Sequence, residues 1–141
     1  MSRMTPEAWR EIEFFTPEED GWGDWRRLDR SLIYTLDKIR KFARKRFYVH
    51  CAYEERLKGW HPKGQAIDGH FEDLHPVEMF EIASRFDEIN GLGFYMWWNN
   101  PGIHLDTRHS TYKLDYDARW MSLSKGDYLP ITANNLRKAL D

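Results

Sequence analysis

The sequence is poor in cysteine and contains no long apolar run. Cys51 is the single cysteine among 141 residues, so no intrachain disulfide can form and the fold does not depend on an oxidising compartment. No stretch approaches the roughly 20 apolar residues of a membrane-spanning helix. The first residues also lack the apolar segment of a secretory signal peptide. We therefore expect synthesis in the cytoplasm without a signal peptide, and no membrane partner.

An excess of positive charge is also missing. Lys and Arg number 21 against 23 Asp and Glu, and the formal net charge is -2. The basic stretch Arg40–Arg46 suits the C-terminus of a helix, where cations meet the negative end of the helix dipole. Because binding to nucleic acid requires a basic field, we expect no nucleic-acid partner.

Aromatic residues, in contrast, are abundant, with 7 Trp, 7 Tyr and 8 Phe. Such side chains bury large areas and also build clefts that bind rings. Packing accounts for most of them, and four are candidates for lining a groove: Trp60, Tyr95, Trp97 and Trp98. Strand alternation predicts Tyr95 and Trp97 on one face and Trp98 on the other. Cys51 lies in a β-rich run and is predicted to be a small core residue, not a nucleophile.

Apolar spacing and end signals predict four helices. The clearest spans Arg26–Arg46, where one apolar stripe repeats at intervals of three and four residues: Leu28, Leu32, Leu36, Ile39 and Ala43. A short helix follows Thr5, and another begins at Pro76 and stops at Asn90–Gly91. The last helix is predicted over Thr132–Leu140.

β-Rich runs predict strands at 47–53, 65–71, 93–98 and 103–108, with a short edge strand at 117–121. The turn at 99–102 makes the third and fourth strands a hairpin. This order predicts the α+β class, with a small antiparallel sheet and helices packed against one of its faces. We expect residues 1–141 to form this single domain as a monomer, with 1–14 and 122–141 at its periphery.

Three residues of zinc-binding types lie on or beside these strands, namely His61, Asp68 and His104. Two imidazoles and one carboxylate are what a catalytic zinc requires, with the fourth position open to water. If the strands at 65–71 and 103–108 are neighbours, the three side chains can converge. Spacing alone leaves the alternative that His61 caps a loop and His104 is a hydrogen-bonded histidine within a strand.

The residues between these ligands form a longer motif. The pattern His61-x-x-Gly64-x-Ala66-x-Asp68, followed by His104-x-Asp106, resembles the zinc peptidoglycan peptidases of the D-Ala-D-Ala carboxypeptidase and L-Ala-D-Glu endopeptidase family. That family looks related to lysostaphin-type and hedgehog-type metal domains. The resemblance spans roughly residues 14–121. The segments 104–108 and 118–120 look like the closing strands of the smaller, phage-associated members.

The resemblance implies a fold, a cofactor and a substrate. It implies a hedgehog-like or D-Ala-D-Ala peptidase-like domain in which His61, Asp68 and His104 bind Zn²⁺. The activity implied is hydrolysis of peptide bonds in peptidoglycan stem peptides, as a carboxypeptidase or an endolysin-type endopeptidase. Such an enzyme without a signal peptide reaches the cell wall through a phage holin or as a component of a virion.

The chain departs from the family pattern at two places. Many members carry an acid three residues before the last ligand, as catalytic base, and here that position is Pro101. Asp106 is our candidate for the base, or for a residue that orients His104. Other residues left open as the base are Glu54, Glu55, His70 and His109.

The second departure concerns the arginine that grips a substrate carboxylate in the family. Its position is matched here by Glu54. Arg56 and Arg108 are the candidates to replace it, with Arg119 as a further option, because the guanidinium fork suits a terminal carboxylate.

A binding or structural module is the rival interpretation. On this view the metal site persists without catalysis, and the domain recognises the cell wall or serves as a structural part of a virion. Pro101 is the feature that favours it, because proline has no group that can move a proton.

Overall fold

A five-stranded sheet forms the centre of the computed structural model, which describes residues 1–108 and 118–141. The strand order is β1-β2-β4-β3-β5, with β1 (Phe47–Cys51), β2 (Ala66–Phe71), β3 (Gly91–Tyr95), β4 (Gly102–Asp106) and β5 (Ala118–Ser122). The predicted α+β class is confirmed. The sheet is mixed and not wholly antiparallel, because β5 pairs in parallel with β3. The strands β3, β4 and β5 alternate in direction, and β5 joins the far side of β3 instead of lying beside β4.

The helices lie at the predicted places in the sequence but with shorter bounds. They are α1 (Pro6–Trp9), α2 (Arg30–Ala43), α3 (Pro76–Ala83) and α4 (Ala133–Leu140), with short 3₁₀ turns η1 (Trp25–Arg27) and η2 (His61–Lys63). The helix predicted over Arg26–Arg46 is interrupted at Asp29, whose side chain accepts a hydrogen bond from the Ser31 backbone N–H and caps α2. The chain leaves α2 at Arg44, which adopts the left-handed conformation with φ 58°.

The predicted helix stop at Asn90–Gly91 is wrong. Helix α3 already ends at Ala83, and the chain continues through turns, in which the N–H of Phe86 donates to the Ala83 carbonyl and that of Ile89 to the Phe86 carbonyl. Gly91 is instead the first residue of β3. The turns bury Ile89, which is fully excluded from solvent, and this apolar contact shortens the helix.

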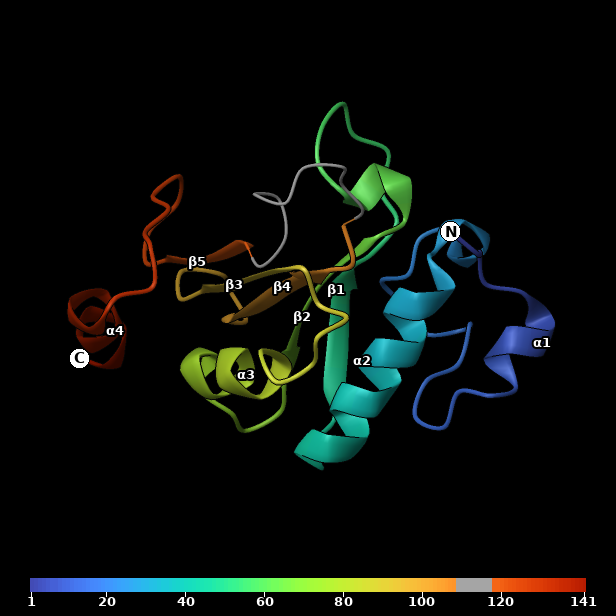
Figure 1. Ribbon diagram of the computed structural model, residues 1–141, viewed down its shortest axis with the longest axis horizontal. Helices are drawn as coiled ribbons and strands as arrows, with labels where there is room; N and C mark the ends of the chain where they lie inside the picture. The colour runs from blue at the N-terminus through green and yellow to red at the C-terminus, as the bar shows by residue number, and fades with distance from the viewer. Residues whose placement is uncertain (109–117) are drawn as a thin grey trace.

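The two faces of the sheet differ in what covers them. One face is apolar and fully buried, with Ile67, Leu92, Phe94, Ile103 and Leu105. Helices α2 and α3 lie along this side, and α4 lies at the end next to β5 (Figure 1). The opposite face bears the alternate residues of the same strands, including Asp68, His104 and Asp106. The described helices thus lie against one face, and the second face, which is polar and which they leave uncovered, is available for a site.

The terminal segments expected at the periphery also contribute to the core. Met4, Ala8 and Trp9 are buried, and Trp9 lies 5.4 Å from Trp22 between ring centroids. In α4, Ala139 is 7% exposed. Within the described ranges, no helix has the length and apolar character needed to span a membrane.

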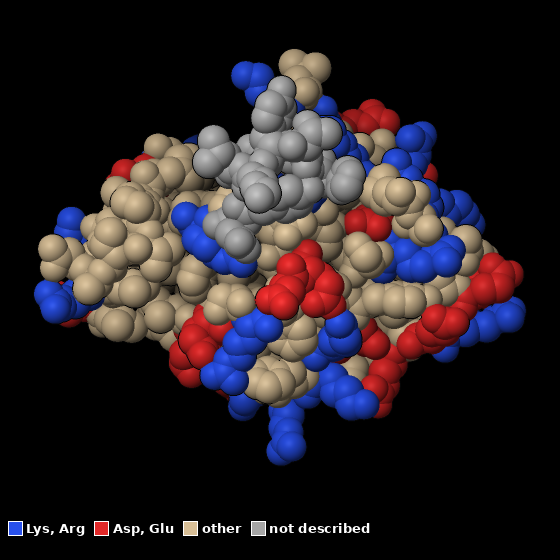
Figure 2. All heavy atoms as spheres, in the orientation of Figure 1, with Lys and Arg blue, Asp and Glu red and all other residues tan. Residues whose placement is uncertain are grey.

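Charged side chains of both signs are interleaved over the helices on the face shown in Figure 2. The end formed by β5 and α4 carries fewer of them (Figure 2). This face therefore presents no single-sign patch of the kind that binds a phosphate backbone.

Asp29 joins three elements that flank the polar face. It is 4% exposed. One of its oxygens accepts hydrogen bonds from the Thr107 hydroxyl at 2.6 Å and from the Ser31 hydroxyl at 2.9 Å. Its backbone N–H donates to the Gly64 carbonyl at 2.7 Å. The start of α2, the end of η2 and the end of β4 are thereby held together.

We expect Asp29→Ala to lower the free energy of unfolding of the metal-free protein by about 2–4 kcal/mol, because it removes a helix cap and leaves a buried hydroxyl unpaired. Urea denaturation followed by circular dichroism measures this. Asp24 is the matched control, since it caps η1 with a half-exposed side chain, and Asp24→Ala is expected to cost less than about 1 kcal/mol. Equal losses in the two variants would contradict the joining role of Asp29.

Candidate metal centre

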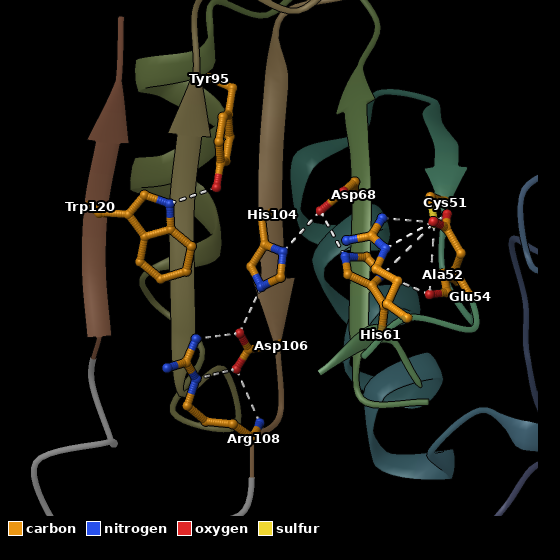
Figure 3. Close-up of polar contacts among 11 residues, drawn as sticks. Cys51, Ala52, Glu54, His61, Asp68, Tyr95, His104, Asp106, Arg108 and Trp120 are labelled. Carbon is orange, nitrogen blue, oxygen red and sulfur yellow. Dashed lines mark hydrogen bonds and ion pairs between the residues drawn. The ribbon is translucent and has the colours of Figure 1, made fainter. Parts of the chain in front are cut away.

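His61, Asp68 and His104 meet on the uncovered face of the sheet (Figure 3). Asp68 on β2 stands directly opposite His104 on β4 in the antiparallel register, and facing residues of such strands lie close enough for their side chains to touch. Asp68 Oδ1 lies 2.9 Å from His104 Nδ1 and 3.3 Å from His61 Nε2. One ligand atom from each residue lies within 4.8 Å of the other two. The group can hold a metal ion, as the sequence predicts.

The η2 turn delivers His61 to this point. Gly64 ends the turn in the left-handed conformation, with φ 73°, which only glycine adopts without strain. A Cβ atom there would also overlap the Arg27 carbonyl. The Gly64 N–H donates to the His61 carbonyl at 3.0 Å. The glycine of the motif is therefore required by the geometry of the turn that carries His61.

Each histidine has its second nitrogen held outside the group. His61 Nδ1 lies 2.7 Å from the Ala52 carbonyl oxygen, to which it donates. His104 Nε2 lies 2.7 Å from Asp106 Oδ2. Bonds of this kind fix the ring orientation and leave the other nitrogen, His61 Nε2 or His104 Nδ1, facing Asp68. Such paired outer contacts are typical of metal-binding histidines, and they supply the test of fit that spacing alone cannot.

Asp106 is engaged on both of its oxygens. The Arg108 guanidinium donates to Oδ1 at 2.9 Å and to Oδ2 at 2.8 Å, and the Arg108 backbone N–H donates to Oδ1 at 3.1 Å. The carboxylate is 0% exposed. A Cβ atom on Gly91 would overlap both carboxylate oxygens, so this glycine makes the room for the pair. The arrangement favours the orienting role for Asp106 over the role of a base.

The charges in the group reinforce one another. Burial lowers the pKa of His61, but hydrogen bonds to Asp68 and Cys51 outweigh it and raise the pKa to about 9. Burial likewise lowers the pKa of His104, and the bonds to Asp106 and Asp68 raise it to about 9. The two imidazoles in turn hold the pKa of Asp68 well below its usual range despite the burial. Without a metal, both imidazoles are therefore protonated at pH 7.

A cleft of about 320 Å³ opens over the three ligands. Six of the twelve residues that line it are tryptophan or tyrosine: Trp60, Tyr95, Trp97, Trp98, Trp120 and Tyr128. All four aromatic residues predicted for a groove are among them. A larger cavity of about 570 Å³ lies beside Asp29 and the start of α2. We place the site at the smaller cleft, because it contains the converging ligands.

The aromatic walls correct one prediction and add two residues. Tyr95 and Trp98 stack with ring centroids 4.2 Å apart, so they share a face although strand alternation separates them. The reason is that β3 ends at Tyr95. Trp120 and Tyr128 were missed. Trp120 stands opposite Gly93 in the β3–β5 register, and its Nε1 donates to the Tyr95 hydroxyl oxygen at 2.8 Å. The sequence feature that could have identified Trp120 is the glycine at position 93, which leaves room for a large side chain from the neighbouring strand.

The predicted substrate arginines differ in their surroundings. Arg56 lines the cleft and pairs with Glu54 at 2.9 Å, with a side chain 41% exposed. Arg108 also lines the cleft, but its guanidinium is held by Asp106 and lies 5.4 Å above the Trp60 ring. Arg119 donates instead to the backbone carbonyls of Ile89 and Asn90. Arg56 is therefore the arginine placed best to receive a ligand.

The other base candidates lie apart from the ligands or outside the description. Hydrogen bonds from Arg56 and Cys51 hold the pKa of Glu54 at about 2. Glu55 is exposed and does not line the cleft. His70 pairs with His50 at 2.6 Å. His109 falls outside the described residues.

The prediction that Cys51 is a core residue is wrong. Its side chain is half-buried at the edge of the metal centre, and Sγ lies 2.9 Å from Glu54 Oε2 and 3.9 Å from His61 Nδ1. The register of β1 shifts between Val49 and Cys51, and this irregularity turns the thiol away from the core.

Metal binding should release protons. Because His61 and His104 have pKa values of about 9, binding of Zn²⁺ at pH 7 must displace about two protons. We expect the zinc association constant to rise on the order of 100-fold per pH unit between about pH 6.5 and 8. The same protons stabilise the metal-free fold at low pH, and this contribution is lost as the pH rises through about 9.

Isothermal titration calorimetry in buffers of different ionisation enthalpy counts these protons. His75→Asn is the control, because His75 caps α3 away from the cleft and asparagine preserves a cap. It should leave the proton count unchanged. Release of fewer than one proton per zinc in the wild type would contradict the assignment of the two histidines as ligands.

The orienting role of Asp106 predicts a loss of metal affinity. An amide at this position cannot accept all the hydrogen bonds that the carboxylate receives, so Asp106→Asn is expected to weaken zinc binding about 10- to 100-fold. Competition with a chromogenic chelator gives the dissociation constant. Asp127→Asn, in an exposed position, is the control. Wild-type affinity in Asp106→Asn would rule out the orienting role.

The metal centre rests on its own geometry, because comparison with known proteins identifies no relative. No family model matches the chain, and no curated protein or solved structure matches it.

Proposed function

We propose that the protein is a zinc-dependent peptidase that acts on the stem peptides of peptidoglycan. The observation that carries the proposal is the ligand set, in which two oriented histidines and one aspartate converge at the floor of a cleft. A zinc ion held by three protein ligands activates water and acts as a Lewis acid toward an amide carbonyl. The motif from His61 to Asp106 supports peptidoglycan as the substrate through its resemblance to the zinc peptidoglycan peptidases.

The cleft supplies contacts that suit a peptide with free carboxylates. Arg56 lies at its rim with a partly exposed guanidinium, and such a fork binds a carboxylate in two places. We assign Arg56 to the substrate carboxylate and Arg108 to holding Asp106 in place.

The Tyr95 hydroxyl is our candidate donor to the reacting carbonyl. Its oxygen accepts the bond from Trp120 Nε1, which leaves its hydrogen available to donate. Burial raises the pKa of Tyr95, so the hydroxyl remains protonated at working pH. A donor aimed at developing negative charge lowers the barrier to amide hydrolysis.

A non-catalytic metal-binding module is the second candidate, for cell-wall recognition or as a structural part of a virion. Pro101 favours this candidate. It directly precedes β4, and many of the peptidases have an acid at the matching position. The two candidates make different predictions for the fate of the stem peptide.

Digestion of purified sacculi tests the proposal. The zinc-loaded protein should release new amino or carboxyl termini, identified by mass spectrometry of the muropeptides, and a chelator should stop the release. His61→Ala should abolish both zinc binding and hydrolysis, because it removes a ligand. Tyr95→Phe should bind zinc normally and lower kcat about 100-fold, because it removes the hydroxyl that donates to the carbonyl. It also removes the acceptor of the Trp120 Nε1 hydrogen bond.

Tyr128→Phe is the matched control, because Tyr128 lines the same cleft with 62% of its surface exposed. It should keep nearly full activity. Zinc-loaded protein that binds sacculi without producing new termini would support the non-catalytic module. Wild-type protein that binds no zinc would overturn both candidates.

A further inference from the structure

A row of aromatic rings continues from the metal cleft across the uncovered face of the sheet. Beyond the Tyr95–Trp98 stack, the Trp98 ring lies 5.7 Å from His50, and His50 lies 4.9 Å from His70. His70 in turn stacks on Tyr48 at 5.0 Å, with the planes 18° apart. We call Tyr48, His50, His70 and Trp98 the aromatic band.

Core packing does not account for the band. Tyr48 and Trp98 belong neither to the buried core cluster nor to the partly buried apolar residues packed against it. Both are half-buried, and His50 is exposed. Large aromatic rings left at a surface in mutual contact are typical of binding surfaces.

The band and the metal centre are parts of one surface. His70 follows Asp68 by two residues on β2, so both side chains point to the same face about 7 Å apart along the strand. Trp98 belongs to both, because it lines the metal cleft and also contacts His50. A ligand that occupies the two parts would therefore pass Trp98.

The chemistry of the band suits an uncharged polymer of rings. Its members offer the ring surface that their mutual contacts leave exposed, together with the Tyr48 hydroxyl and the imidazole nitrogens outside the His50–His70 contact as hydrogen-bonding groups. Successive stacking rings hold repeating units without requiring charge, as aromatic platforms do for the bases of single strands. Pyranose rings have apolar C–H faces and polar hydroxyl or acetamido edges, which match these two features.

We propose that the aromatic band binds the glycan strand of peptidoglycan while the attached stem peptide enters the metal cleft. The identity of the polymer rests on the proposed function. One sugar ring stacks on Trp98, and the neighbouring sugar lies over His50, His70 and Tyr48. The Arg46 guanidinium, 4.6 Å above the Tyr48 ring, closes the far end. The protein thus selects stem peptides that are still attached to glycan.

Binding of a peptide-free probe tests the band separately from catalysis. The probe is a β-1,4-linked tetramer of N-acetylglucosamine, added to zinc-free and zinc-loaded protein and followed by tryptophan fluorescence and by NMR shifts of the His50 and His70 rings. Wild-type protein should bind it equally well with and without zinc. Trp98→Ala and His50→Ala should each weaken binding at least tenfold while retaining the wild-type zinc affinity, which shows that they are folded.

Phe42→Ala is the control, because Phe42 is 50% exposed on α2, a helix that packs against the other face. It should bind the tetramer normally. No tetramer binding by the wild type, or undiminished binding by both band variants, would overturn the proposal. Shifts of the His50 and His70 rings by a free stem peptide but not by the tetramer would assign the band to peptide and also overturn it.

The outcome separates the band from the proposed activity. If the protein binds the tetramer but cleaves no stem peptide, glycan binding by the aromatic band is supported and the proposed peptidase activity is refuted. Where hydrolysis does occur, Trp98→Ala should slow the digestion of sacculi about tenfold more than the digestion of a free stem peptide. Equal slowing on both substrates would show that Trp98 acts only in the metal cleft, and would count against the glycan proposal.

Discussion

The contact of the Asp68 carboxylate with two imidazoles is the interaction on which the polar face depends. Both histidines approach the same oxygen, and in the metal-free protein they hold protons that balance its charge. Removing one partner from such a buried group leaves a charge uncompensated, which costs roughly 3–5 kcal/mol. The Ala52 carbonyl and the Asp106–Arg108 pair then fix the outer side of each ring. A metal ion bound here would replace these protons between side chains that are already oriented.

Glycines make the space that this frame needs. On the uncovered face, a Cβ atom on Gly91 would overlap Asp106 and Arg108, and one on Gly93 would overlap the Trp120 indole. Large side chains from neighbouring strands can therefore lie across β3 in place of its own side chains. The glycines weaken the strand itself, and burial of the opposite face at Leu92 and Phe94 compensates. The apolar core thus supports a strand in which two of the five residues are glycines that make room for the site.

The fold class and the three candidate metal ligands could be predicted from the sequence, but the packing of the aromatic side chains that line the cleft could not. The β-rich runs predicted the strands that carry Asp68 and His104, and alternation predicted the face to which each side chain points. The antiparallel register then brings the two residues together, so both candidate ligands could be predicted from the local sequence pattern. The position of β5 beyond β3 depends on a long-range choice of edge that no local pattern encodes, and with it the site gains Trp120. The turn of Trp98 toward Tyr95 arises after β3 has ended, where period-two alternation no longer applies. The shift of register between Val49 and Cys51 could not be predicted either, because regular alternation does not apply across it.

The cleft constrains how any proton could move. Among the described residues that line it, Asp68 is the sole carboxylate, and it belongs to the group that could hold a metal ion. Asp106 has both oxygens occupied, and the position three residues before His104 is Pro101. Among the described residues that line the cleft, no carboxylate is therefore available to act as a general base. Loss of activity at low pH would then follow protonation of the ligands His61 and His104, which releases the metal, and not titration of a separate base. In the proposed peptidase, metal occupancy and catalytic activity would depend on the same two imidazoles.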